Sequence, residues 1–179
     1  EIQYHFLAGA GVEEGTESTP SGNGCTINVG LMRPRSRGRL SLRSNDPLAP
    51  PAIDARYLTD PYDMECMAEG VRIGQEIMEQ DSIKRFVSSP YNPGKLLKTT
   101  AERKAFVLEA AQGAVHPCCG CSMGTSSESV VDPKFKVHGI EDLRVADSSA
   151  MPRILSGNLN GPTVMMAERA AEFIANGYI

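Results

Sequence analysis

The chain has 179 residues, with 18 Lys and Arg against 22 Asp and Glu, which gives a formal net charge of −4. Hydrophobic residues make up 41% and charged residues 22%, as in an ordinary globular protein, and the length suits one domain or parts of two. The acidic balance argues against nucleic-acid binding, which usually goes with a basic surplus, and no apolar run approaches the roughly 20 residues that span a bilayer.

The start of the chain and its cysteines give two further indications. Residue 1 is Glu and a strand-like run follows at once, which suggests a processed chain, one subunit of a cut protein or a trimmed segment. The five cysteines are an odd number and three lie together, whereas a secreted disulfide scaffold is typically smaller and has evenly spread cysteines. We therefore expect a reducing compartment and a cytoplasmic location.

The first half of the sequence predicts short strands followed by two helices. Strands are expected over residues 1–8, 25–32 and 39–43, with a Gly-, Ser- and Thr-rich loop over residues 9–24. Asp60 and Pro61 are typical residues for a helix start, and apolar residues recur at helical spacing to about residue 80. Thr99 and Glu102 match a capping box, which predicts a second helix that stops near Gly113.

The last third of the sequence is rich in Gly, Ser and Asn. Short strands are expected over residues 129–131 and 143–146. A final helix is expected from about 161 to 176, with Asn160 as its N-cap, Pro162 in its first turn and Gly177 as its stop. Because strands and helices cluster instead of alternating, the sequence predicts an α+β fold.

The segment HPCCGC, residues 116–121, holds the densest group of reactive side chains. The Cys118-x-x-Cys121 spacing resembles a redox motif or half of a zinc site, but zinc usually needs a second ligand pair and a thioredoxin-like motif needs a βαβ setting. Small, buried side chains in a tight loop are the simpler interpretation, and no metal site is expected. His116 is either a general base or a structural histidine.

Two features near the C-terminus are candidates for ligand contacts. The polar run over residues 156–160 leads into the final helix, whose N-terminus offers N–H groups and partial positive charge to an anion or a carbonyl. Asn160 alone is more typical of a simple cap. Asp147 ends a strand-like stretch before two serines, where a carboxylate either contacts a ligand or stabilises a turn.

Residues 116–176, from HPCCGCSMG through VVDPKFKVHGIEDLRVADSSAMPRILSGNLNGPTVMMAERAAEFI, resemble the C-terminal segment of glucose-methanol-choline (GMC) flavoprotein oxidoreductases. The choline dehydrogenase and alcohol dehydrogenase branch is the most similar, and residues 33–63 resemble the strand and linker of that family's substrate domain. The resemblance implies a substrate-binding portion over residues 1–113 and elements completing the FAD-binding domain over residues 114–179. Because the family's N-terminal dinucleotide-binding segment is missing from this sequence, we expect a partner chain or segment to carry it.

The same resemblance implies FAD-dependent oxidation of a primary or secondary alcohol, with hydride transfer to flavin N5. His116 matches the family's base, and Asn160 matches the partner that holds the substrate oxygen. Asn158 is the alternative if the register is shifted. The residue types suit this chemistry, because a neutral imidazole accepts a proton near working pH and an amide N–H stabilises a developing alkoxide.

The resemblance also implies positions that contact the flavin cofactor: Ala146, Asp147, Ser148, Asn160, Pro162 and Thr163. The final helix is expected to direct its N-terminus at the flavin C2=O, with backbone N–H groups near Pro162 and Thr163 as the contacts. The stretch 146–148 is expected near the ribityl and pyrophosphate groups.

One departure from the family pattern keeps alternatives open. Cys119-Gly120 stands where the family has Gly-Thr, which places thiols near the expected flavin edge. The alternatives are a non-oxidative member, such as a hydroxynitrile lyase or a photodecarboxylase, a non-catalytic subunit that completes a partner, and a metal-binding protein built on the three clustered cysteines.

Overall fold

The structure is a computed structural model that describes residues 1–9 and 23–177. Most of the predicted loop over residues 9–24 therefore lies outside the described residues. The chain forms two compact units, the first built from Glu1–Arg39 and Ala55–Gln112 and the second from Leu40–Asp54 and Gly113–Ile179. Each unit is described by itself.

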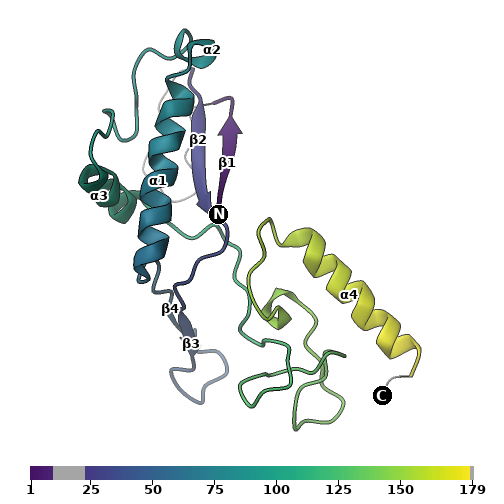
Figure 1. Cartoon of the computed structure of the whole chain (residues 1–179). Coiled ribbons are helices and arrows are strands. Elements are labelled where there is room, and N and C mark those ends of the chain that lie inside the picture. Colours follow the sequence, from purple (N-terminus) through teal and green to yellow (C-terminus); the bar gives the residue numbers. More distant parts are fainter. Residues whose placement is uncertain (10–22, 178–179) are drawn as a thin grey trace. The chain divides into compact units, whose positions relative to one another are not determined.

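The first unit is a two-stranded sheet covered by a long helix (Figure 1). β1 (Ile2–Leu7) pairs antiparallel with β2 (Thr26–Leu31), and both strands were predicted. α1 (Pro61–Met78) packs on the sheet through Gly70 and Gly74. A Cβ atom added at Gly70 would lie 2.7 Å from Cγ1 of Val29, so the missing side chain is what permits the close approach.

A buried carboxylate joins the start of α1 to the turn that follows β2. Asp60 caps the helix as predicted, accepting a hydrogen bond from the backbone N–H of Tyr62. Asp63, in the first turn of the helix, is fully buried and accepts hydrogen bonds from the N–H groups of Arg35 and Ser36 and from the Ser36 hydroxyl. This set of bonds holds the basic turn against the helix N-terminus.

Two shorter helices complete the first unit. α2 (Asp81–Lys84) is too short for periodicity to predict, and α3 (Thr100–Ala110) begins at the expected capping box of Thr99 and Glu102. α3 ends at Ala110, short of Gly113, because Ala111 is already extended. The buried apolar residues of this unit that cluster together are Val71, Leu97 and Val107.

The second unit holds a small two-stranded sheet and one long helix. β3 (Arg39–Ser41) lies within a predicted strand, whereas its partner β4 (Ala52–Asp54) follows a proline-rich stretch and was not predicted. α4 (Asn160–Ala175) is followed by Gly177, whose φ of +68° is the left-handed conformation typical of a helix stop. The core of the unit consists of Val131, Phe135, Ala150, Met151, Leu159, Met166 and Ala170.

The strands predicted over residues 129–131 and 143–146 are wrong. The structure has isolated bridges there, such as Val131 with Val137 and Lys136 with Arg144. Phe135 and Asp142 both adopt a positive φ, so the chain turns too tightly for a continuous ladder to form. Mixed helices and small sheets nevertheless agree with the predicted α+β class.

Candidate functional site

The loop that carries His116 is fixed to a short 3₁₀ turn, η1 (Ser148–Ala150), by a series of hydrogen bonds. The backbone N–H groups of alternate loop residues donate to successive carbonyls of the turn: Cys119 to Ser148 (3.2 Å), Cys121 to Ser149 (2.9 Å) and Met123 to Ala150 (2.9 Å). The Ser148 hydroxyl adds a bond to the carbonyl of Pro117 (3.0 Å). These bonds anchor residues 117–123, and His116, which is exposed, directly precedes this segment.

His116 has an asparagine beside it. The Nδ2 atom of Asn158 lies 3.5 Å from Nε2 of His116, at the outer limit of a hydrogen bond. Within the described residues, the hydrogen bond to His116 comes from Asn158 and none comes from Asn160. An amide donor at Nε2 favours the tautomer in which this nitrogen carries no proton and can accept one.

Asn160 has a different place from the one expected. It is the first residue of α4, and Leu159 is the N-cap, with no side-chain hydrogen bond to the helix. The expectation that Asn160 caps the helix is therefore wrong, because the backbone reaches helical geometry one residue earlier than the cap pattern suggests. The amide of Asn160 is exposed and is not used by the helix.

The N-terminus of α4 presents fewer backbone donors than expected. The N–H of Thr163 donates to Leu159 O (2.9 Å), as does the Thr163 hydroxyl (2.7 Å), and Pro162 has no N–H. Helical geometry leaves the N–H groups of Asn160 and Gly161 without an acceptor inside the helix. A Cβ atom on Gly161 would meet nothing within 4 Å, so the space beside these donors is open.

Asp147 caps the η1 turn. Its Oδ1 atom accepts hydrogen bonds from the Ser149 hydroxyl (2.5 Å) and the Ser149 N–H (2.8 Å), which hold the pKa of the Asp147 carboxyl below its ordinary value. The neighbouring Ala146 is half-buried against the core of the unit. Ser149 had no predicted role, and only its place two residues after an Asp could have indicated this turn.

The three clustered cysteines are half-buried thiols in the same loop. The sulfur atoms of Cys118 and Cys119 lie 3.1 Å apart, with the Cys119 thiol donating. Cys119 also has a φ of +70°, the left-handed region that non-glycine residues seldom occupy. Among the described residues, no three His, Cys, Asp or Glu side chains are grouped so as to hold a metal ion.

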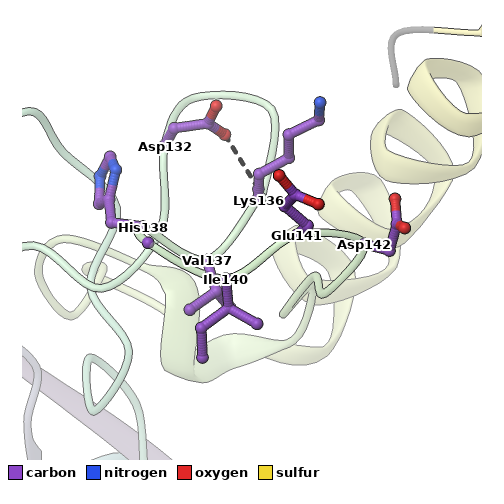
Figure 2. A pocket seen from close by; sticks show the side chains of 8 residues that line it. Asp132, Lys136, Val137, His138, Ile140, Glu141 and Asp142 are labelled. Atoms are coloured by element: carbon purple, nitrogen blue, oxygen red, sulfur yellow. Dashed lines mark hydrogen bonds between the residues drawn. The ribbon is translucent and has the colours of Figure 1, made fainter.

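An open pocket of about 460 Å³ lies elsewhere in the same unit, over residues 132–142 (Figure 2). Asp132 accepts a hydrogen bond from the backbone N–H of Lys136 at its rim. The carboxylates of Glu141 and Asp142 point away from Val137, as Figure 2 shows. None of the predicted site residues lines this pocket, and we do not assign the chemistry to it.

A family model described as GMC oxidoreductase matches residues 34–167, most of the chain. This chain belongs to the GMC oxidoreductase family. The matched range contains every predicted site residue, from His116 to Thr163.

Named relatives and solved structures agree with this assignment. The oxygen-dependent choline dehydrogenase of Paraburkholderia phytofirmans is 45% identical over 97% of this chain and 31% of its own length. The structure of formate oxidase from Aspergillus oryzae, in a study of FAD modification, has a TM-score of 0.84, with 33% identity over 90% of this chain and 29% of the oxidase. Pyridoxine 4-oxidase from Mesorbium loti, at 24% identity over 98% of this chain and 34% of that one, shares the fold with a TM-score of 0.89.

The GMC match is partial in length. The chain spans about a third of the length of the curated relatives it matches.

No helix among the described residues combines the length and the apolar character that crossing a membrane requires.

Proposed function

We propose that this chain is the C-terminal part of an FAD-dependent oxidoreductase that oxidises a primary or secondary alcohol. The observation that carries the proposal is the exposed pair in a GMC family chain formed by His116, next to the anchored loop, and Asn158, just before α4. The similarity to choline dehydrogenases, at 45% identity over nearly the whole chain, supports an alcohol as the substrate class.

The residues at the start of α4 fit a flavin. The uncapped helix N-terminus presents the N–H groups of Asn160 and Gly161 beside open space, and carbonyl oxygens of an isoalloxazine ring are acceptors of the kind that these donors suit. The helix dipole adds partial positive charge there. When bound, FAD supplies the hydride acceptor at its N5 atom.

His116 is the proposed base. Its ring is exposed, so an alcohol hydroxyl can reach it, and the Asn158 amide at 3.5 Å favours the tautomer in which Nε2 carries no proton; the substrate hydroxyl would then displace this long contact. A neutral imidazole removes the hydroxyl proton as the carbon–hydrogen bond breaks. The anchoring of residues 117–123 along η1 limits where the ring can lie, which lowers the entropic cost of orienting it.

Asn160 and Asn158 have different proposed roles beside the substrate. We assign Asn160 to the substrate oxygen, because its exposed amide is not used by the helix and an N–H donor stabilises a developing alkoxide without titrating. Asn158 contacts His116. We assign it as a positioning residue that would also border the substrate.

The remaining cofactor contacts lie on η1 and the first turn of α4. Oδ1 of Asp147 already accepts both Ser149 donors, so a ribityl hydroxyl suits Oδ2, whereas pyrophosphate would be repelled by the ionised carboxylate. Ala146 and Ser148 flank this position, and Pro162 and Thr163 shape the helix start with no free backbone N–H. Residues 114–179 would thus complete the FAD-binding domain, and residues 1–113 would contribute to the substrate domain.

A partner segment is part of the proposal. α4 buries Met166 and Ala170 in its own unit, while Val164 and Met165 on the opposite side of the helix remain more than half exposed. Apolar side chains exposed along one helix typically mark a surface that another element covers. We propose that the N-terminal FAD-binding segment of the same enzyme, present in the longer relatives, covers it.

Purification of this chain together with that segment tests the proposal. We expect one FAD per complex and reduction of the flavin by aliphatic or aromatic primary alcohols. A matched complex carrying Gly161→Val, which fills the open space beside the α4 N-terminus, should lose flavin while remaining folded. A folded complex of both parts that binds no flavin, or flavin that no alcohol reduces, would contradict the proposal.

A further inference from the structure

The pair Cys118 and Cys119 is not used by the proposed reaction, although it lies two residues from His116. Its sulfur atoms are 3.1 Å apart, inside the distance at which two non-bonded sulfurs normally rest. Both side chains are half-buried against the core of the second unit, so they are partly open to solutes.

The backbone explains how neighbouring side chains come to meet. In an extended chain, successive side chains point to opposite faces, which would separate two adjacent sulfurs. Cys119 instead adopts a φ of +70°, and this left-handed conformation turns its side chain to the same side as that of Cys118. The hydrogen bond from the Cys119 N–H to Ser148 O (3.2 Å) holds this conformation in place.

We infer that Cys118 and Cys119 form a vicinal dithiol, a modification site that a hydroperoxide oxidises to a disulfide between adjacent residues. One thiolate attacks the peroxide oxygen, which gives a sulfenic acid and releases one water molecule. The second thiol then attacks the sulfenic sulfur, which forms the S–S bond and releases a second water. Two thiols lose two electrons and two protons, and one hydrogen peroxide becomes two waters.

The geometry makes this disulfide labile. A sulfur–sulfur bond is about 2.0 Å long, so the two atoms must approach by about 1 Å. Adjacent Cα atoms are about 3.8 Å apart across a trans peptide, less than the usual 4.4–6.8 Å of a disulfide. Such strain makes the bond more easily reduced, so a dithiol reductant is expected to reverse it.

The sequence spacing suggested a different pair. Cys118-x-x-Cys121 has the separation of a redox motif, but the sulfur contact in the structure joins Cys118 to Cys119. Cys121 therefore serves as the control, since it shares the loop and the half-buried environment.

Mass spectrometry of the intact enzyme that contains this chain tests the inference. After treatment with hydrogen peroxide, alkylation and trypsin digestion, the peptide over residues 105–134 carries all three clustered cysteines, while Cys25 and Cys66 fall in other peptides. We expect this peptide to lose the mass of two hydrogens and to be alkylated only at Cys121. Dithiothreitol should restore all three alkylation sites.

Single substitutions identify the partners. Cys121→Ser should still form the disulfide, whereas Cys118→Ser and Cys119→Ser should each abolish it. Phenylarsine oxide, which needs two close thiols, supplies a measurement without a variant and should protect Cys118 and Cys119 from alkylation. Loss of the disulfide in Cys121→Ser would overturn the inference. Oxidation of Cys118 and Cys119 to separate sulfinic or sulfonic acids, with no disulfide formed, would overturn it as well.

A consequence for activity rests on the proposed function. If His116 is the base, closing a ring two residues away displaces it from Asn158, so oxidation should lower turnover and dithiothreitol should restore it. The mass measurement does not depend on that assignment, so a disulfide without an effect on turnover would count against His116 and not against the dithiol.

Discussion

Replacing Asp63 removes the acceptor that holds the basic turn against α1. The carboxylate is fully buried and receives three donors, which are the N–H groups of Arg35 and Ser36 and the Ser36 hydroxyl. In Asp63→Ala all three lose a charged acceptor, and Arg35 and Ser36 have nothing in the same place to bond to. The turn should therefore detach from the helix start.

The size of the effect follows from the count of donors. A hydrogen bond to a charged group contributes about 1.5–3 kcal/mol, so the sum of three such bonds is an upper limit on the loss of unfolding free energy in Asp63→Ala. Arg35 is exposed and Ser36 half-buried, so water can replace part of what is lost. We expect Asp63→Ala to lower the free energy of unfolding by about 3 kcal/mol, and Asp63→Asn by less because its amide oxygen still accepts.

The same carboxylate gives a pH dependence of known sign. Burial raises the pKa of Asp63, but the Arg35 N–H and the Ser36 hydroxyl and N–H outweigh it and hold the pKa below its ordinary value of 3.8. A depressed pKa contributes stability that is fully present above pH 3.8 and is lost as pH falls below it. The stability difference between wild type and Asp63→Asn should therefore shrink on acidification through that range.

Urea unfolding and amide hydrogen exchange of the enzyme that contains this chain measure both effects. Protection of the Arg35 and Ser36 amides should disappear in Asp63→Ala. Glu79→Gln is the matched control, because it removes an exposed carboxylate at the other end of α1, and it should leave the unfolding midpoint unchanged. Equal stability and equal amide protection in wild type and Asp63→Ala would refute the reasoning.

Two further predictions concern α1 and the helix caps. Gly70→Ala forces a Cβ to 2.7 Å from Val29 and should lower the free energy of unfolding by about 1–3 kcal/mol, measured by thermal unfolding. Gly74→Ala meets only ordinary contacts and should be neutral or stabilising. Equal effects of the two substitutions would contradict the packing of α1 on the sheet. Thr99→Ala should lower the free energy of unfolding by about 1 kcal/mol because it removes the α3 cap. Asn160→Ala should leave stability unchanged, because Asn160 does not cap α4, and a loss as large as that of Thr99→Ala would contradict the structure.

Elements that carry their own local signals were predictable from the sequence. Asp60 with Pro61, and Thr99 with Glu102, mark two helix starts correctly because a cap is a bond between residues two or three positions apart. The stop at Gly177 is equally local. β4 was missed because three residues give too short a pattern, and its pairing with β3 depends on residues distant in the chain.

The site was predictable in its residues but not in its contacts. The resemblance to GMC enzymes singled out His116 and both asparagines, but only the structure shows that Asn158 is the one beside the imidazole. The sulfur contact between Cys118 and Cys119 follows from a positive φ that a cysteine rarely adopts, so no propensity could predict it. The strands expected over residues 129–131 and 143–146 fail for the same reason, since two unusual turns interrupt the ladder.

The rate of flavin reduction by an alcohol, measured without oxygen in a single turnover, tests the central claim most directly. The enzyme would contain this chain with its N-terminal segment, fully loaded with FAD, as wild type and as His116→Ala. The account predicts that His116→Ala slows reduction by about 10²–10⁴-fold, the usual contribution of a general base, while flavin content stays the same. Reduction at the wild-type rate in the flavin-loaded variant would contradict it.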